Sequence, residues 1–468
     1  MSNYYYRTGA LLLLILMSTS LFSQRAPFNR EEFINRRDAL MNKADADMII
    51  LFGKPAPETG TPFRQDNDFY YFTGIEEPGS VLIMLPASGE SVLFQPVLAE
   101  REIYVSGSNI LCSGEDPAEK GFDAVVPVGH LDEYIVRNCG RRSGSDVYIR
   151  IMPPDVVNGG RMEMDLHYAR SARSHYNDQL TLNTYRVNKL KERYPYINFH
   201  DISPLVDELR VIKTDWEKEI LRKNGKVSAE GVKAAIMVTE PGVYEYEVEA
   251  AAMNVVSSHG ALGAAYPPIV ASGPNSCTLH YDRSSRKAED GDVLLIDFGA
   301  CMDYLTMDIS RTWPVNGKFS PEQKKVYRLL LAIQKACIES YKPGVKEKDV
   351  IAYVEKKLGK MDLDLSGLEN YISHSMKPPV ENGELKVENI ISGFGHFVGM
   401  AVHDVGVYGD EGLRPGMVFA IEPGLYNPET GIGVRIEDTV LITDDGCEVL
   451  TRAVPKEIDE IEELMNVE

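Results

Sequence analysis

Short apolar runs alternate with polar, helix-forming segments between residues 28 and about 178. Met48–Phe52 (MIILF) and Val81–Pro86 (VLIMLP) are continuous apolar runs, a pattern typical of buried strands. Arg30–Lys43 is charged and has the period of a helix. This alternation of strands and helices predicts an α/β domain in the first part of the chain.

The pattern changes near residue 205, where a connector leads into a long amphipathic helix with Asp215 as its expected N-cap. Pro321–Ser340 and Glu347–Leu358 have the period of two further helices, and Met417–Ile421 and Gly433–Ile442 are predicted strands. Helices and strands are segregated here, which favours an α+β domain. At 468 residues the chain exceeds the size at which one hydrophobic core stops growing. We therefore expect two domains, residues 24–204 and 205–468.

The segment Leu294–Trp313 places Asp297 and Asp308 between apolar runs that predict a β-hairpin, with Gly299 as a break. Carboxylates are almost never fully buried unless they are paired or bind a metal. A single buried aspartate is usually a satisfied structural residue, but two on one hairpin suggest a hard or borderline cation. Other parts of the chain would have to complete its ligand set.

Three more candidate ligands follow along the chain. His396 lies among glycines in SGFGHFVG, Glu422 ends an apolar run before Pro-Gly, and Glu437 lies in GIGVRIED. Taken singly, each has an ordinary interpretation as a turn, a strand end or a sheet edge. Together, four carboxylates and one imidazole suit Mn, Co, Fe or Zn, and four negative charges would offset two divalent ions. Two such ions about 3.5–4 Å apart can share a hydroxide nucleophile and polarise a carbonyl.

Six short motifs then occur in order: DFG at 297–299, MDISRTWPV at 307–315, GHFVG at 395–399, VHD at 402–404, EPGLY at 422–426 and GVRIED at 433–438. In this combination the chain resembles the pita-bread dinuclear metallopeptidases, and among them aminopeptidase P more than prolidase. FRQDNDFYYFTG at 63–74 also resembles the N-terminal domain of the proline-specific members. The resemblance implies an α/β, creatinase-like N-terminal domain and an α+β pita-bread (creatinase/aminopeptidase) catalytic domain.

The resemblance also implies roles for the five candidate ligands. Asp297 and Asp308 would hold one metal ion with Asp308 shared, His396 and Glu422 would complete the other site, and Glu437 would bridge. The implied reaction is hydrolysis of the bond between an N-terminal residue and a following proline, through a hydroxide bridging two divalent metals. Glu422 would also relay the proton of the attacking water. Manganese is the metal expected first, with cobalt, zinc and iron as alternatives.

Three further residues acquire roles from the same resemblance. His280, in CTLHY, matches a family histidine near the scissile carbonyl, and His403 matches one that contacts substrate and stabilises the transition state. Arg435 lies two residues before Glu437, so on one strand it would share the same face and steady the bridging carboxylates. The alternative is a structural role for each histidine and a surface salt bridge for the arginine.

One position departs from the family pattern. Many proline-specific relatives carry a second histidine four residues before the metal-binding one, where this chain has Ser392. The departure bears on pocket geometry and substrate preference rather than on the metal ligands. Relatives that grip the free carboxylate of a dipeptide have an arginine near Gly409–Gly416, where we find no clear counterpart although Arg414 is present. This favours an Xaa-Pro aminopeptidase over an Xaa-Pro dipeptidase (prolidase).

Two other interpretations keep the fold but change the function. A creatinase-like hydrolase would use histidines without metal, and a non-catalytic pita-bread binding module would have lost several ligands. Retention of all five candidate ligands argues against both. The expected partners are peptide substrates with proline at the second position, and the resemblance implies a homo-oligomer.

The first 23 residues have the layout of a secretory signal peptide. Arg7 precedes the apolar run ALLLLILM, and small residues lead to an expected cleavage site between Ser23 and Gln24. The apolar run is short for a bilayer span, although an uncleaved anchor is the alternative. We therefore expect a periplasmic or secreted protein. The net charge of −21 argues against nucleic acid or an anionic membrane as a partner.

Overall fold

The computed structural model describes residues 25–58, 61–140, 144–174, 176, 180–391 and 395–466. The chain divides into two units. Unit 1 comprises the residues up to Ala26 with Ile212–His403 and Val407–Glu468, and unit 2 comprises Pro27–Val211 with Asp404–Gly406. The expected signal peptide lies outside the described residues. Within the described ranges, no helix combines the length and the apolar character that a membrane crossing requires.

Unit 2 is built on a six-stranded mixed sheet in the order β4-β3-β2-β1-β5-β6. Its strands are β1 (Met48–Phe52), β2 (Val81–Leu85), β3 (Glu90–Gln95), β4 (Ala124–Pro127), β5 (Ser145–Ile149) and β6 (Ile197–Asp201). β1 pairs antiparallel with β2 and parallel with β5. Both strands that the apolar runs predict are present, and their continuous apolar character follows from burial of the central strands on both faces.

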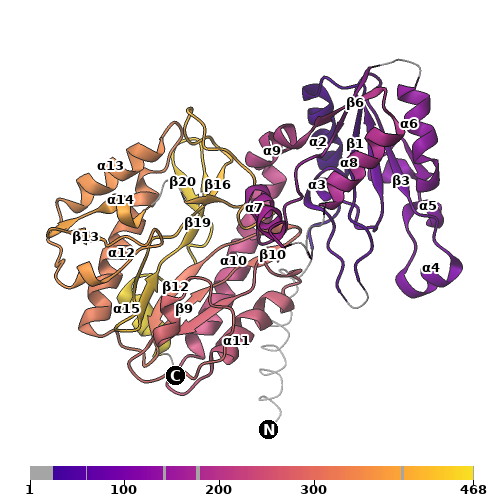
Figure 1. Cartoon of the computed structure of the whole chain (residues 1–468). Coiled ribbons are helices and arrows are strands. Elements are labelled where there is room, and N and C mark those ends of the chain that lie inside the picture. The colour runs from indigo at the N-terminus through magenta and orange to yellow at the C-terminus, as the bar shows by residue number, and fades with distance from the viewer. Residues whose placement is uncertain are drawn as a thin grey trace, which may run out of the picture. The chain divides into compact units, whose positions relative to one another are not determined.

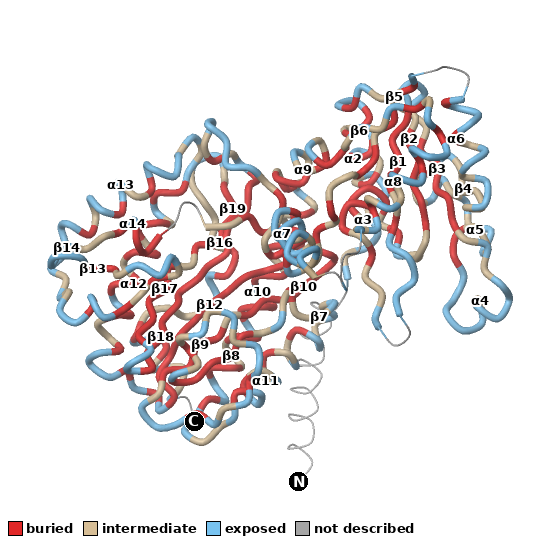
Figure 2. Tube along the Cα trace, viewed as in Figure 1, coloured by how far each residue is buried: buried red, intermediate tan, exposed pale blue. Residues whose placement is uncertain are grey.

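Helices lie against this sheet (Figure 1), and its central strands are buried along their length (Figure 2). The helices of unit 2 are α2 (Arg30–Lys43), α3 (Asn67–Thr73), α4 (Glu100–Ser106), α5 (Ile110–Ser113), α6 (Leu131–Cys139), α7 (Arg161–Ser171), α8 (Leu182–Arg193) and α9 (Ser203–Val211). Ile135 of α6 and Leu190 of α8 pack in one core cluster with Ile50 and Ile83. Side chains alternate between the faces of a strand, so the equally buried Ile49 points to the opposite face.

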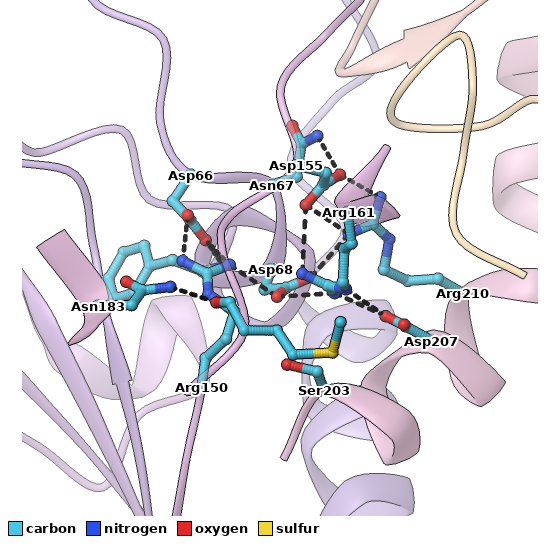
Figure 3. Close-up of polar contacts among 12 residues, drawn as sticks. Asp66, Asn67, Asp68, Arg150, Asp155, Arg161, Asn183, Ser203, Asp207 and Arg210 are labelled. Carbon is cyan, nitrogen blue, oxygen red and sulfur yellow. Dashed lines mark hydrogen bonds and ion pairs between the residues drawn. The ribbon is translucent and has the colours of Figure 1, made fainter. Parts of the chain in front are cut away.

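A network of buried charges joins several segments of unit 2 (Figure 3). Asp68, on α3, accepts hydrogen bonds from Arg150 at 2.7 Å, Arg161 at 2.9 Å and Arg210 at 2.7 Å. Asp155 accepts another from Arg210 at 2.8 Å. Burial alone would raise the pKa of Asp68, but the three guanidinium groups outweigh it and hold that pKa well below its usual range. The network therefore fixes the loop after β5, α7 and α9 against α3.

Asp404 belongs to the same network, 194 residues after its partner Arg210. The two side chains form a 2.6 Å ion pair, and each is only 1% exposed. Asp404–Gly406 is accordingly grouped with unit 2, whereas His403 belongs to unit 1. Arg210 lies on α9, which also contacts α2. The main segment of unit 2 therefore includes all of α9 and ends at Val211, whereas the expected boundary at residues 204–205 would divide this helix.

Unit 1 combines long helices with short antiparallel sheets, the α+β arrangement that the sequence predicts (Figure 1). The helices are α10 (Asp215–Met237), α11 (Glu245–Ser258), α12 (Pro321–Ser340), α13 (Glu347–Leu358), α14 (Val387–Ile390) and α15 (Ile458–Met465). The sheets that position the site are β8 (Ile269–Ser272), β9 (Val293–Asp297) and β12 (Ser310–Pro314); β17 (Gly424–Asn427) and β18 (Ile432–Arg435); and β15 (His396–Phe397), β16 (Val418–Ile421), β19 (Asp438–Ile442) and β20 (Cys447–Val449). β7 (Gly263–Ala264), β10 (Ala300–Met302) and β11 (Leu305–Thr306) form another small sheet.

The N-cap of α10 is Thr214, so the prediction of Asp215 is wrong. Oγ1 of Thr214 accepts the backbone N–H of Glu217 at 3.3 Å, and the Glu217 carboxylate accepts the N–H of Thr214 at 2.9 Å. This reciprocal pair, a capping box, satisfies two N–H groups at once. Asp215 instead lies in the first turn, where its carboxylate bonds Lys218.

The expected hairpin is present, because β9 and β12 pair antiparallel with Asp297 opposite Ser310. The chain between them passes through β10 and β11, so Asp308 lies in the segment before β12 and not in a strand. Gly299 lies at the start of this intervening segment. A Cβ atom at Gly299 would lie 1.7 Å from the carbonyl oxygen of Met307, so the close approach of the two segments requires glycine.

The predicted strand Gly433–Ile442 is divided in two. β18 ends at Arg435 and β19 begins at Asp438, and these two strands belong to different sheets. Glu437 lies in the break between them. The run of apolar residues gave no sign of the break, because the chain stays buried as it passes from one sheet to the next.

Candidate metal centre

Three of the expected ligands converge from separate segments of unit 1. Ligand atoms of Asp308, His396 and Glu437 all lie within 4.8 Å of one another. His396 begins β15, Asp308 precedes β12, and Glu437 precedes β19. Pairing of β15 with β16, and of β16 with β19, brings the imidazole to the same sheet end as Glu437.

The other two expected ligands lie at the same cluster. Nε2 of His396 is 3.5 Å from a carboxylate oxygen of Asp308 and 3.5 Å from one of Glu422. The phenol of Tyr266 hydrogen-bonds to Asp297, at 2.6 Å, and also to Asp308. The structure therefore brings together all five residues that the sequence selected as metal ligands.

The charge environment of the cluster fits divalent cations. Burial and repulsion from Asp297 raise the pKa of Asp308 well above its ordinary value, and burial and repulsion from Asp308 do the same for the pKa of Glu437. Oε1 of Glu437 is buried without a hydrogen-bond partner among the described residues. An unpaired carboxylate oxygen in such a place costs free energy that a cation would recover. This oxygen-rich donor set with one imidazole therefore fits divalent first-row metals.

Hydrogen bonds to the backbone hold the segments of the candidate ligands Asp308 and Glu437 together. Oγ1 of Thr439 accepts the N–H of Asp308 at 3.1 Å and donates to the carbonyl of Asp308 at 2.8 Å. The N–H of Glu437 donates to the carbonyl of Ser310 at 2.9 Å. Arg311, which is fully buried, donates to the carbonyl of Glu437 and to the side chain of Asp438. The segments that carry Asp308 and Glu437 are thus fixed to each other independently of any metal.

Arg435 lies at the cluster, but it is held there in a different way from the one expected. Nη2 of Arg435 is 2.6 Å from Oδ2 of Asp297. Nε of Arg435 donates to Oγ of Ser310 at 2.8 Å, and that hydroxyl donates to Oε2 of Glu437 at 2.8 Å. The expectation that Arg435 and Glu437 share one strand face is wrong, because β18 ends at Arg435. Arg435 is linked to the Glu437 carboxylate through Ser310. It is 3% exposed, so it is not a surface residue.

The two histidines expected to act on substrate, His403 and His280, lie in different surroundings. The ring of His403 lies edge-on to that of His396, with 4.4 Å between their centroids. His280 is exposed, in the turn after the short helix Gly273–Cys277, and its charge acts on the nearby ring of His374. Ser392, the position that departs from the family pattern, lies outside the described residues.

Two residues at the site were missed by sequence reasoning. Tyr266 lies in the loop before β8, directly ahead of Pro267 and Pro268, and no motif marks it. His374 lies in the loop after Tyr371, where neither spacing nor a motif marks it. Its ring stacks on Tyr426 with 5.4 Å between centroids, and burial lowers its pKa.

Comparison with known proteins identifies the family. Residues 219–444 match metallopeptidase family M24, and residues 33–148 match the aminopeptidase P N-terminal domain. The Xaa-Pro aminopeptidase of Haemophilus influenzae is 31% identical over 464 residues, which cover 94% of this chain and 98% of that protein. This chain belongs to the aminopeptidase P branch of family M24.

Solved structures of family members agree. Aminopeptidase P from E. coli with the inhibitor Pro-Leu, and the zinc-substituted enzyme with product, are each 29% identical to this chain, with TM-scores of 0.75 and 0.74. Both comparisons cover 94% of this chain and 99% of the other. The expected fold, an aminopeptidase P N-terminal domain followed by a pita-bread catalytic domain, is confirmed. The protein is a metallopeptidase, and hence a hydrolase that uses divalent metal ions.

Proposed function

We propose that this protein is an Xaa-Pro aminopeptidase, which hydrolyses the bond between an N-terminal residue and a following proline with two divalent metal ions. The observation that carries the proposal is the convergence of His396 with four carboxylates, at 3.5 Å from both Asp308 and Glu422. The names of the relatives supply the substrate class, peptides with proline at the second position.

Each ligand has a proposed role. Asp297 and Asp308 would hold one ion with Asp308 shared, His396 and Glu422 would complete the other site, and Glu437 would bridge. Bound divalent ions would supply the positive charge that lowers the pKa of the attacking water and polarises the scissile carbonyl. Manganese is the proposed native metal, with cobalt, zinc and iron as alternatives that the same donors accept.

Proton transfer and charge stabilisation fall to residues around the ligands. The Glu422 side chain is 29% exposed against 7% for Asp308, so Glu422 is better placed to take the water proton and pass it to the leaving amine. His403, beside His396, would stabilise the transition state, and His280 would lie near the scissile carbonyl. Arg435 forms a 2.6 Å ion pair with Asp297 and, through Ser310, orients Glu437.

Activity on a peptide series tests the proposal. The metal-loaded protein should release the first residue of Xaa-Pro tripeptides and longer peptides, and Asp308→Asn should abolish both this activity and the binding of one metal equivalent. Activity restricted to Xaa-Pro dipeptides would make the protein a prolidase instead. Full activity of Asp308→Asn would refute the dinuclear scheme, and metal-loaded protein inert on all these peptides would favour a non-catalytic pita-bread binding module.

We also propose that the protein is exported to the periplasm or secreted, and that it works as a homo-oligomer. Export is supported by the charged, apolar and small-residue order of residues 1–23. Cell fractionation and N-terminal sequencing of the mature chain test the export, with cleavage expected before Gln24. Light scattering of the purified protein tests the assembly, and a monomer at micromolar concentration would contradict it.

A further inference from the structure

A tight turn in unit 1 presents His374 beside the metal cluster. The N–H of Ser373 donates to the carbonyl of Lys377 at 3.0 Å, and the hydroxyl of Ser375 donates to the carbonyl of Asn389 at 3.0 Å. Immediately before the turn, two 2.9 Å backbone hydrogen bonds join Ile372 to Tyr426 of β17. The turn is thus fastened to a strand that begins two residues after Glu422.

The space that His374 occupies is made by a glycine. Nε2 of His374 hydrogen-bonds the hydroxyl of Tyr426, and the two rings stack. A Cβ atom at Gly424 would lie 2.8 Å from that Nε2 and 2.4 Å from the Tyr426 hydroxyl oxygen. The missing side chain therefore lets the imidazole reach the turn that follows the metal ligand Glu422.

The hydrogen bonds around Tyr426 favour one tautomer of His374. Nη1 of Arg435 donates to the Tyr426 hydroxyl at 3.1 Å, and a guanidinium is always a donor. Burial raises the pKa of Tyr426 to about 12, so the phenol keeps its proton at neutral pH. Among the described residues the Tyr426 hydroxyl has no other acceptor, so its proton is assigned to the hydrogen bond with Nε2 of His374. The neutral imidazole then carries its own proton on Nδ1, for which the described residues offer no hydrogen-bond partner.

His374 also lies among charges that belong to the reaction. Glu422, Arg435, Asp297 and His280 all act on its ring, and the residue is half-buried, so that part of it faces outward. A neutral N–H donor at such a place suits an uncharged acceptor, such as a peptide carbonyl, better than a charged one.

We propose that His374 is a substrate-contacting residue, whose Nδ1–H donates a hydrogen bond to a carbonyl oxygen of the bound peptide. Tyr426 and Arg435 are positioning residues that act through it by holding Nε2 as the acceptor. The inference deepens the proposed function and rests on it. It adds to the site an imidazole from a segment that carries none of the family motifs.

Three substitutions of His374 test the contact. An asparagine amide can replace the Nδ1 donor and a glutamine amide the Nε2 position. His374→Ala and His374→Gln should therefore lower kcat/KM for an Xaa-Pro tripeptide by about 10- to 100-fold, whereas His374→Asn should stay within about threefold of the wild type. His130→Ala, at an exposed histidine of unit 2, is the control and should change nothing.

Two further readouts separate a substrate contact from a structural role. His374→Ala should retain the metal content and melting temperature of the wild type while binding Pro-Leu about tenfold more weakly by calorimetry. Tyr426→Phe should lower kcat/KM in the wild type but add no loss to His374→Ala. Loss of metal from His374→Ala, wild-type activity of that variant, or additive losses in the double variant would overturn the proposal.

The tautomer can be measured without activity. In long-range proton–nitrogen spectra of histidine-labelled protein, the His374 signals should report a proton on Nδ1, and Tyr426→Phe should shift the population away from it. A proton on Nε2 in the wild type would contradict the inference. If the wild type is inert on Xaa-Pro peptides, the proposed function fails, whereas an active wild type with an unaffected His374→Ala refutes this inference alone.

Discussion

The hydroxyl of Ser310 donates a 2.8 Å hydrogen bond to Oε2 of Glu437, and it accepts one of the same length from Arg435. Ser310 is fully buried, so water cannot replace it readily. The other oxygen of Glu437 has no partner among the described residues. One carboxylate oxygen is thus held by the protein while the other is left for a cation.

We therefore expect Ser310→Ala to lower the affinity for divalent metal by about 10- to 100-fold, because Glu437 loses the group that orients it. Competition with a fluorescent chelator measures the change. Ser366→Ala is the control, because the Ser366 hydroxyl also bonds a carboxylate, Asp364, but at an exposed place. Equal affinity in the wild type and Ser310→Ala would show that the backbone contacts alone position Glu437.

Tyr266→Phe should destabilise the metal-free protein by about 1–3 kcal/mol, because the carboxylates of Asp297 and Asp308 lose the phenol that both contact. With metal bound the cost should shrink, since the cations then compensate Asp297 and Asp308. Urea unfolding with and without metal measures the difference. Tyr353→Phe, whose hydroxyl bonds Glu339 at 3.2 Å on the exposed surface, should have little effect in either state.

Gly424→Ala should be poorly tolerated, because the added methyl group would overlap the Tyr426 hydroxyl and the His374 ring. We expect a loss of about 1–3 kcal/mol in the free energy of unfolding, together with reduced activity. Gly446→Ala is a matched control, since a Cβ atom there meets nothing within 4 Å. Wild-type stability and activity of Gly424→Ala would mean that the turn carrying His374 adjusts easily.

Asp68→Asn should lower the free energy of unfolding at pH 7 by about 3–5 kcal/mol, because three guanidinium groups lose a shared, buried anion. The folded-state pKa of Asp68 is depressed, so the folded protein binds fewer protons than the unfolded chain. The difference in the free energy of unfolding between the wild type and Asp68→Asn should have its full value above about pH 5. It should shrink as the pH falls below about 3.9, the pKa of an aspartate in the unfolded chain.

Urea unfolding at a series of pH values, followed by circular dichroism, tests this dependence. Asp207→Asn is the control, because burial raises the pKa of Asp207 despite the nearby Arg161. The wild type should therefore show no excess in the free energy of unfolding over Asp207→Asn that disappears as the pH falls. A difference between wild type and Asp68→Asn that stays constant down to pH 3 would contradict the ionised state of Asp68.

The five candidate metal ligands could be selected from the sequence because each is a polar residue in a segment whose neighbours are apolar or glycine. Burying such a residue costs free energy unless it is paired or binds a cation, so a carboxylate or imidazole between apolar neighbours stands out in the sequence. His374 does not stand out in this way, because a histidine in a polar loop is common. Its place follows from the pairing of Ile372 with Tyr426, a contact between segments far apart in the chain.

Details of the backbone were predicted less well, for a related reason. The run that contains Arg435 and Glu437 has the pattern of one continuous strand, and the change of sheet between them depends on packing partners elsewhere in unit 1. At α10, both Thr214 and Asp215 are good N-cap residues, and the reach of Glu217 back to Thr214 decides between them.

The ion pair between Arg210 and Asp404 bears on how this protein can be divided in the laboratory. A gene fragment that starts at Ile212 would encode every candidate metal ligand, yet it would lack the guanidinium that neutralises Asp404. Asp404, the residue next to His403, would then lose its 2.6 Å ion pair with Arg210. Expression of the metal-binding half by itself should therefore give a protein that is poorly ordered around residue 404, and Asp404→Asn is the substitution to include in any such fragment.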